Sequence, residues 1–166
     1  MIRFEDVNDQ AAIFALNTVA FESDGEAKLV DQLRVQADPV ISLVAESDDR
    51  ITGHILFSPV TTDPPTSLSI MGLAPMAVSP DLQRTGIGSR LVETGLEQCR
   101  KAGVDAVVVL GHPSFYPKFG FVSAPNLGFH SEYDVPEDAF LMLEIKPGIL
   151  KDAAGLVKYH PAFADV

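Results

Sequence analysis

The sequence predicts one α/β domain in which a mixed sheet is flanked by helices, and three observations support this. A strand over about Leu68 to Val78, a helix over Gly86 to about Ala102 and a strand over Val104 to Leu110 follow one another, which predicts a right-handed βαβ unit. The last of these runs is almost continuously apolar, as is typical of a strand that is buried on both faces and parallel to its neighbour. Val40 to Glu46 and Ile51 to Val60 flank a polar turn, which predicts an antiparallel hairpin.

The segment before the hairpin predicts a short strand and two helices. Ile2 to Glu5 alternates between apolar and polar residues, and Asn8 or Asp9 can cap the helix that follows. A second helix is expected from Glu26 to Gln36, with its apolar residues on one face. Asp38-Pro39 should end it, because the residue before a proline is disfavoured in a helix.

The strand over Leu68 to Val78 contains Pro75, which cannot donate a hydrogen bond to a neighbouring strand. We therefore expect a bulge or bend there that frees at least one backbone group from sheet pairing. The helix that follows carries one apolar stripe, and Gly103 is expected to end it. That stripe should pack on the sheet.

The rest of the chain has weaker patterns. Ser114 to Phe119 leaves room only for a short helix before Gly120, and Ala139 to Ile145 predicts a last strand. Residues 126–136 predict a loop or a short strand. Residues 1–166 are expected to form a single domain, in which 147–166 is a C-terminal tail that docks on the body or on a partner subunit. A homodimer is therefore left open.

A glycine-bearing turn joins the central strand to the helix, and it has the features of an anion site. Gln83 to Gly88 lies where the first backbone N–H groups of the helix have no partner within the helix. Gly86 and Gly88 lack a Cβ, so a phosphate can approach the main chain. Arg84 and Arg90 add positive charge beside it.

Two common phosphate-binding motifs do not fit this turn. A P-loop requires Lys-Ser or Lys-Thr after its last glycine, whereas Gly88 is followed by Ser89-Arg90. A dinucleotide fingerprint requires a third glycine, and Leu91 occupies that position.

The pattern Gln-Arg-x-Gly-x-Gly after a strand ending Met-Ala-Val-x-Pro closely resembles the acetyl-CoA signature of the GNAT superfamily of N-acyltransferases. The segment Leu110 to Phe121, in which Tyr116 precedes Gly-Phe, resembles that family's next landmark. The resemblance extends from Ile2 to about Pro147 and is closest to the YhbS-like bacterial subgroup. It implies a GNAT-like fold, with a central twisted mixed sheet and a splayed parallel strand pair, and acetyl-CoA as co-substrate.

The resemblance also implies which residues contact acetyl-CoA. The splayed sheet is expected to expose backbone groups of Met76, Ala77 and Val78 to the pantetheine arm. The phosphates are expected at the turn and the first helical residues, namely Gln83, Arg84, Thr85, Gly86, Ile87, Gly88 and Ser89. The acceptor would be an amine, which we expect to belong to a small molecule.

Acyl transfer from a thioester to an amine depends mostly on orientation, so we expect direct attack in a ternary complex. A backbone N–H of Met76 or Val78 can polarise the thioester carbonyl. The resemblance gives Tyr116 the role of the acid that protonates the leaving thiolate. The alternative is that Tyr116 only packs between Phe115 and Phe119.

The general base is open, because Leu68 to Val78 contains no ionisable residue where many members of the resembled family carry a glutamate. Glu22 or Glu26 can contact a cationic acceptor, or they can belong to a solvated helix cap. His112 can act as base or touch the pantetheine, but we favour a role in orienting the loop that follows it. The missing glutamate keeps a second hypothesis open, a catalytically silent acyl-CoA-binding module that senses or scaffolds.

Composition narrows the classes of partner. The net charge is −11, from 12 Lys+Arg and 23 Asp+Glu, which disfavours nucleic acid and anionic membranes. The first residues lack an apolar secretory core and no apolar run approaches the ~20 residues of a membrane span, so we expect a cytoplasmic protein.

The four histidines and the single Cys99 have no metal-ligand spacing, so no metal is expected. Cys99 should be a buried apolar residue, not a nucleophile.

Overall fold

The computed structural model describes residues 1–166 apart from the side chain of Asp165. Its main sheet has the strand order β1-β2-β3-β5-β6-β9-β7 and a smaller sheet has the order β4-β10-β8. The strands are β1 Ile2–Phe4, β2 Ile41–Ser47, β3 Arg50–Pro59, β4 Thr61–Asp63, β5 Ile70–Val78, β6 Ala106–Leu110, β7 Val122–Ser123, β8 Phe129–Ser131, β9 Phe140–Glu144 and β10 Gly155–Lys158.

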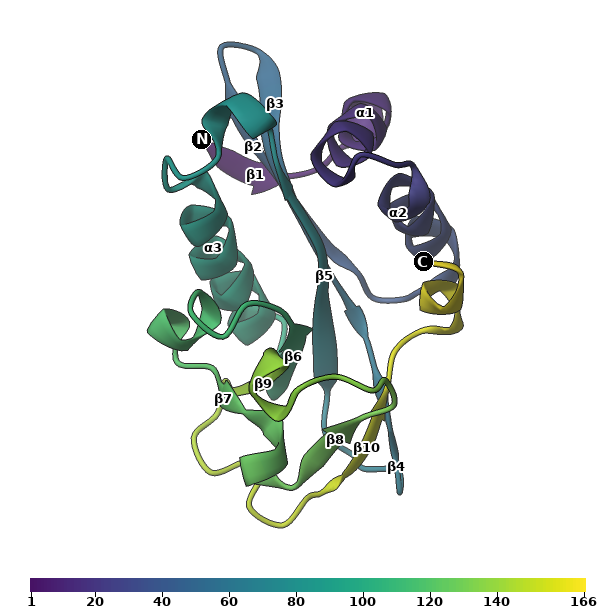
Figure 1. Cartoon of the computed structure of the whole chain (residues 1–166), viewed down its shortest axis with the longest axis vertical. Coiled ribbons are helices and arrows are strands. Elements are labelled where there is room, and N and C mark those ends of the chain that lie inside the picture. The colour runs from purple at the N-terminus through teal and green to yellow at the C-terminus, as the bar shows by residue number, and fades with distance from the viewer.

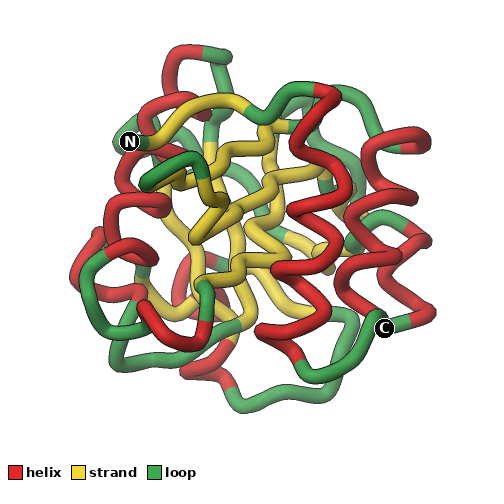
Figure 2. The backbone as a smooth tube through the Cα atoms, turned by 90° about the horizontal axis from the view of Figure 1, so that it is seen from above, coloured by secondary structure: helices red, strands yellow, loops and turns green.

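Three α-helices cover the two faces of the main sheet. They are α1 Gln10–Phe21, α2 Gly25–Gln36 and α3 Ile87–Lys101. Figure 1 shows α3 on one side of β5, with α1 and α2 on the other, and Figure 2 shows from above how the strands run between helices. Short 3₁₀ helices fill the connections: η1 Val7–Asp9, η2 Pro80–Leu82, η3 Tyr116–Phe119, η4 Ala124–Leu127, η5 Glu137–Ala139 and η6 Pro161–Asp165.

The parallel pair β5 and β6 is joined only at its beginning. The two strands pair from Ile70 opposite Ala106 to Gly72 opposite Val108. Beyond Gly72, β5 pairs with β3 alone, while β6 continues along β9. The sheet therefore opens into a fork after Gly72, and this splayed parallel pair confirms the predicted architecture.

The bulge predicted at Pro75 is present in β5. Ile55 of β3 lies opposite Met76, but Phe57 lies opposite Leu73, so the register shifts across this step. Two residues of β5 stand there against one residue of β3. The extra residue bends the strand away from regular pairing at the point where the fork opens.

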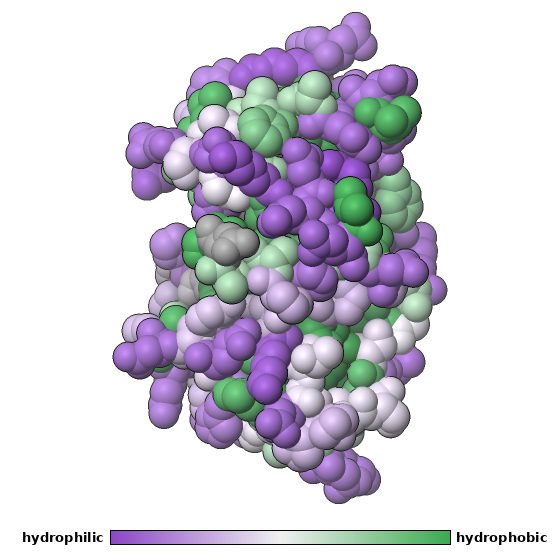
Figure 3. Space-filling view, turned by 90° about the vertical axis from the view of Figure 1, so that its right-hand side faces the viewer, coloured by the Kyte–Doolittle hydropathy of each residue, from purple (hydrophilic) through white to green (hydrophobic). Residues whose placement is uncertain are grey.

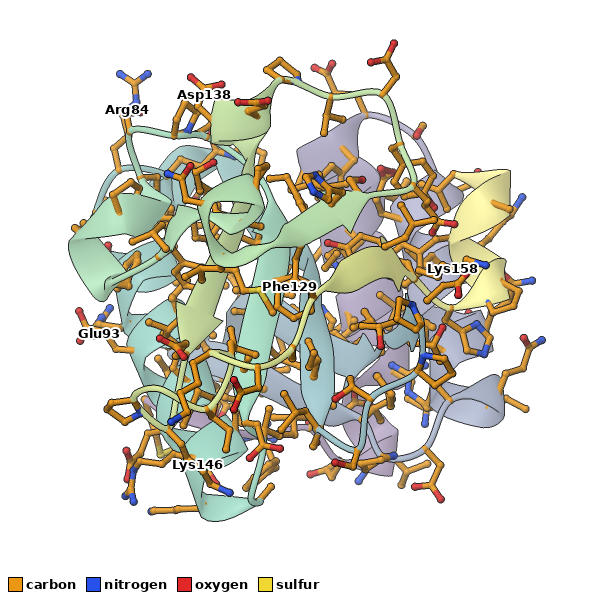
Figure 4. The ribbon with its side chains drawn as sticks, turned by 90° about the horizontal axis from the view of Figure 1, so that it is seen from below. Arg84, Glu93, Phe129, Asp138, Lys146 and Lys158 are labelled. Atoms are coloured by element: carbon orange, nitrogen blue, oxygen red, sulfur yellow. The ribbon has the colours of Figure 1, made fainter. Side chains whose placement is uncertain are left out.

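The hydrophobic core is divided by the main sheet. The stripe of α3 packs on one face with alternate residues of β5 and β6, among them Leu91, Met71 and Val107. On the other face, α1 and α2 cover the part near β2 and β3. The remaining part of that face is covered by β8, β10 and the loops around them, with Phe129 at its centre (Figure 4).

The smaller sheet was not foreseen from the sequence. Thr61–Asp63 pairs antiparallel with β10, and β10 runs parallel to β8. The last residues return to α2, where Ala162 is buried beside residues of α1 and α2. The segment 147–166 is thus packed on the described chain through both β10 and η6.

Candidate active site

The turn before α3 leaves a set of backbone donors free. Arg84 has φ 65° and Gly86 has φ 94°, both in the left-handed region, and α3 begins at Ile87. Arg90 N–H donates to the Gly86 carbonyl at 3.1 Å as the helix starts. The N–H groups before Arg90 have no carbonyl one turn earlier in the helix, so they point outward with the positive end of the helix dipole.

Two side chains hold the turn in this shape. Gln83 Nε2 donates to the Val78 carbonyl oxygen at 3.3 Å, and Thr85 Oγ1 donates to the Leu82 carbonyl oxygen at 2.5 Å. Gln83 therefore ties the turn to the end of β5. Thr85 closes the turn on η2.

The turn opens on a cavity of about 630 Å³ between β5, α3 and the segment after β6. Eight of the predicted site residues line it: Met76, Val78, Gln83, Arg84, Gly86, Gly88, Ser89 and Tyr116. A Cβ on Gly88 would project toward Met76 and Phe115, at 3.7 and 3.8 Å from their nearest side-chain atoms. The missing side chain thus leaves the helix terminus open to a ligand with phosphate groups.

Three predicted residues contribute no lining to the cavity. Ala77 is a buried residue of β5, Ile87 packs into the core beneath α3, and Thr85 is used in the turn. Their backbone groups stay candidates for contacts with a ligand.

The backbone of β5 offers donors to the fork at two positions. Ser79 N–H donates to the Thr52 carbonyl of β3 at 2.8 Å. Bonded and non-bonded pairs alternate in an antiparallel ladder, so Ala77 bonds to β3 and the N–H groups of Met76 and Val78 face the other edge. That edge is the one from which β6 has separated.

Tyr116 reaches the cavity from the end of β6. It is 7% exposed, and its ring makes edge contacts with Phe115 and Phe121 at centroid distances of 5.0 and 5.6 Å. A Cβ on Gly111 would lie 2.3 Å from the Tyr116 ring, so only glycine fits beside it. Burial raises the pKa of Tyr116 to about 12, because the phenolate is poorly solvated there. The phenol is therefore a proton donor at neutral pH.

His112 also lines the cavity, and its backbone shapes the next turn. Its carbonyl oxygen accepts from the N–H groups of Phe115 at 3.1 Å and Tyr116 at 3.4 Å. These backbone contacts shape the turn that carries Tyr116, and the role of the His112 side chain stays a prediction.

Glu22 and Glu26 lie apart from the cavity. They belong to the junction of α1 and α2, on the opposite side of the sheet from α3 (Figure 1). Glu22 is exposed with φ 58°, and Glu26 is half-buried in the first turn of α2. Figure 3 shows this side of the molecule, whose upper half is mostly hydrophilic with separate hydrophobic residues.

Sequence reasoning missed two side chains near the fork. Lys118 lines the cavity, and its position in Phe-Tyr-Pro-Lys-Phe-Gly-Phe, two residues after Tyr116, was the available signal. Tyr159 comes from the tail, and its ring lies where a Cβ on Gly72 would meet it at 2.8 Å. Its hydroxyl is buried without a hydrogen-bond partner among the described residues. No local pattern connects Tyr159 to the fork.

Neither a metal nor a thiol marks the site. Among the residues that the structure describes, no three His, Cys, Asp or Glu side chains gather as a metal-binding group. Cys99 lies on the buried face of α3, and burial raises its pKa to about 12. A thiolate nucleophile is therefore disfavoured at neutral pH. In the described chain, no helix is both long and apolar enough to span a bilayer.

Comparison with known proteins gives consistent matches over most of the chain. The model of the Acetyltransferase (GNAT) family matches residues 10–121. The chain is 37% identical over 164 residues to the N-acetyltransferase YhbS of Escherichia coli (strain K12), which covers 98% of each protein.

Solved structures agree with this. The crystal structure of the E. coli GNAT family N-acetyltransferase YhbS in complex with CoA superposes with a TM-score of 0.92 at 36% identity, covering 99% of this chain and 91% of that one. A GNAT family acetyltransferase from Brucella melitensis in complex with acetyl-CoA gives a TM-score of 0.81 at 35% identity, covering 98% of this chain and 97% of that one.

Proposed function

Because this chain belongs to the Acetyltransferase (GNAT) family, we propose that it transfers an acetyl group from acetyl-CoA to the primary amine of an acceptor. The observation that carries the proposal is that one cavity is lined both by the helix-terminal turn and by Tyr116. A phosphate-binding end and a proton donor in the same cavity suit a thioester of CoA.

Residues of the turn and of β5 provide partners for the pyrophosphate and the pantetheine arm of acetyl-CoA. The free N–H groups at the start of α3 and the nearby Arg84 suit the pyrophosphate. Arg84 projects outward from the turn (Figure 4). The N–H groups of Met76 and Val78 suit the pantetheine arm and the thioester carbonyl, because they lie on the open edge of β5.

Bound acetyl-CoA would supply an activated acetyl group with a thiolate leaving group. A backbone N–H of Met76 or Val78 donates to the carbonyl oxygen, where negative charge develops during attack. Tyr116 holds its proton and donates it to the departing sulfur. Cys99 lies in the core instead of the cavity, which supports direct attack by the amine over a thiol-linked acyl-enzyme.

The acceptor is expected to approach from the side of the sheet that carries α1 and α2. Glu22 or Glu26 would attract a cationic amine there. The net charge of −11 likewise favours a positively charged acceptor. We expect a small molecule. The β5 strand carries no ionisable side chain, so water or one of these carboxylates would take the amine proton.

Calorimetric titration with acetyl-CoA, and separately with ATP and NAD at matched concentration, tests the site. We expect binding of acetyl-CoA alone, followed by amine-dependent thiol release in a screen of primary amines. Tighter binding of ATP or NAD would refute the assignment. Binding of acetyl-CoA without thiol release from any amine would favour the rival hypothesis of a silent acyl-CoA-binding module, which the lack of an ionisable residue in β5 keeps open.

A further inference from the structure

Lys118 is held in one place beside the first turn of α3. Its Nζ donates to Ser89 Oγ at 2.8 Å. The same ammonium lies 4.4 Å from the ring centroid of Phe115 and 5.2 Å from that of Phe119, both within the range of cation–π attraction. The two rings pack edge to face at 5.2 Å. A flexible, exposed lysine is thereby restricted to the wall of the cavity, which reduces the entropy lost when it binds a ligand.

Lys118 stands where the acetyl-CoA cavity meets a second hollow. A groove of about 410 Å³ runs between α3 and the end of η3, lined among others by Glu93, Leu96 and Phe119. Among the lining residues of the two spaces, Lys118 is the only one that belongs to both. A ligand that leaves the cavity toward this groove must pass the ammonium.

The groove would repel an anion without this lysine. Glu93 and Glu144 line it, and Glu93 projects outward from α3 (Figure 4). The groove's arginine, Arg100, is bound to Glu97, so its charge is largely neutralised. Lys118 pairs with no carboxylate among the side chains that the structure describes. It is thus the free cation available at the entrance of an otherwise acidic groove.

We propose that Lys118, positioned by Ser89 and by the rings of Phe115 and Phe119, binds the 3′-phosphate on the ribose of CoA. The chain would therefore discriminate CoA from dephospho-CoA, which lacks only that group. This inference rests on the proposed function, because it requires that CoA occupies the cavity.

Lys118 is assigned to the 3′-phosphate because the pyrophosphate has other partners in the cavity. The pyrophosphate has the free N–H groups of the turn and Arg84 as partners. In CoA the ribose follows the pyrophosphate, so its phosphate group extends beyond the partners that the turn provides. The third phosphate then needs its own cation, and Lys118 is the one that the cavity and the groove share.

The test measures the Kd of CoA and of dephospho-CoA by calorimetry for the wild type, Lys118→Met, Lys118→Arg and Lys101→Met. Methionine keeps an unbranched apolar side chain on the two rings and removes the charge. Lys118→Met should bind CoA about tenfold more weakly and dephospho-CoA within about twofold of the wild type. Lys118→Arg should restore most of the preference for CoA.

Lys101→Met is the matched control, since Lys101 is another exposed lysine and lies at the far end of α3. It should leave both Kd values unchanged. Equal weakening of both ligands by Lys118→Met, or no change in either, would overturn the role at the 3′-phosphate while acetyl transfer stands. Failure of the wild type to bind CoA would overturn the proposed function itself.

Discussion

Tyr116 combines the environment of a core residue with a place on the cavity wall. Its ring packs between Phe115 and Phe121, and it also lines the space that includes the α3 turn. Packing alone would explain the burial. It would not explain why a hydroxyl, instead of phenylalanine, stands at the wall of the predicted acetyl-CoA site.

Tyr116→Phe removes that hydroxyl and keeps the ring. We expect turnover to fall by about 100-fold, with the Kd of acetyl-CoA unchanged, because the phenol acts on the leaving sulfur. Since burial raises the pKa of Tyr116 to about 12, the wild-type rate should not decline between pH 7 and 10 through loss of this proton. Tyr133→Phe, at an exposed tyrosine, is the control. An unchanged rate for Tyr116→Phe would remove the residue from the mechanism.

The hydroxyl of Tyr159, unlike that of Tyr116, is expected to reduce stability, because it is buried with no hydrogen-bond partner among the described residues. Such a group loses its bonds to water on folding without gaining others. Tyr159→Phe should therefore raise the free energy of unfolding by about 1 kcal/mol, measured by urea denaturation. A loss of stability would reveal a partner that the structure does not show.

At the scale of elements, α3 lies between two glycines with similar geometry and different surroundings. Gly86 precedes it with φ 94°, and Gly103 follows it with φ 83°. A Cβ at either position would meet no atom within 4 Å. Both glycines are therefore required for backbone conformation, and only Gly86 lines the cavity.

This pair makes a controlled experiment on the phosphate-binding turn. Gly86→Ala and Gly103→Ala should each cost about 1–2 kcal/mol of stability, because alanine is strained in the left-handed region. Only Gly86→Ala should also weaken acetyl-CoA, by about tenfold, since its methyl group would occupy the approach to the helix terminus. Thermal unfolding and calorimetry separate the two effects. Equal Kd values for both variants would show that the turn does not bind the phosphates.

At the scale of the whole molecule, a network of polar side chains ties the N-terminal half together on the face of the sheet that α1 and α2 cover. His54 on β3 contacts Asn17 of α1 at 3.4 Å and Ser42 of β2 at 2.9 Å. Ser42 Oγ donates to Glu5, which also accepts from Arg34 of α2 at 3.0 Å. Because the Ser42 proton goes to Glu5, His54 must donate from Nε2 and is neutral with Nδ1 as acceptor.

The environment of His54 predicts how the free energy of unfolding depends on pH. Burial lowers the pKa of His54 to about 3, with a further contribution from the charge of Arg34. In the unfolded chain the pKa is about 6.5, so the unfolded state binds the proton first as pH falls. The stabilisation is complete above about pH 6.5, and about 2 kcal/mol should be lost between pH 8 and 5. Urea denaturation across this range measures it.

His54→Gln tests whether His54 causes that slope. The variant should show a flatter stability profile between pH 8 and 5, whatever its stability at pH 8. In the wild type, the His54 ring protons should keep their NMR shifts over this range. A normal titration of His54 near pH 6.5 would contradict the assignment.

Much of this site could be predicted from sequence because its parts are local. The turn Gln83 to Gly88 and its helix are encoded by neighbouring residues, and so is the bulge at Pro75. A role of Tyr116 at the sulfur could be proposed only through the resemblance of its segment to a family landmark. Lys118 was overlooked, because its contact with Ser89 spans 29 residues and depends on how η3 packs against α3.

The sequence by itself determined the βαβ core, the N-terminal hairpin and the glycine-bearing turn before α3, because hydrophobic period, glycine and proline act on the residues beside them. Only the tertiary structure decided the small sheet of β4, β10 and β8, the residue after which β5 and β6 separate, and the place of Tyr159 beside Gly72. Strands of three or four residues are too short for their hydrophobic pattern to predict which strands they pair with. Their pairing is chosen by long-range packing, which no short stretch of the chain contains.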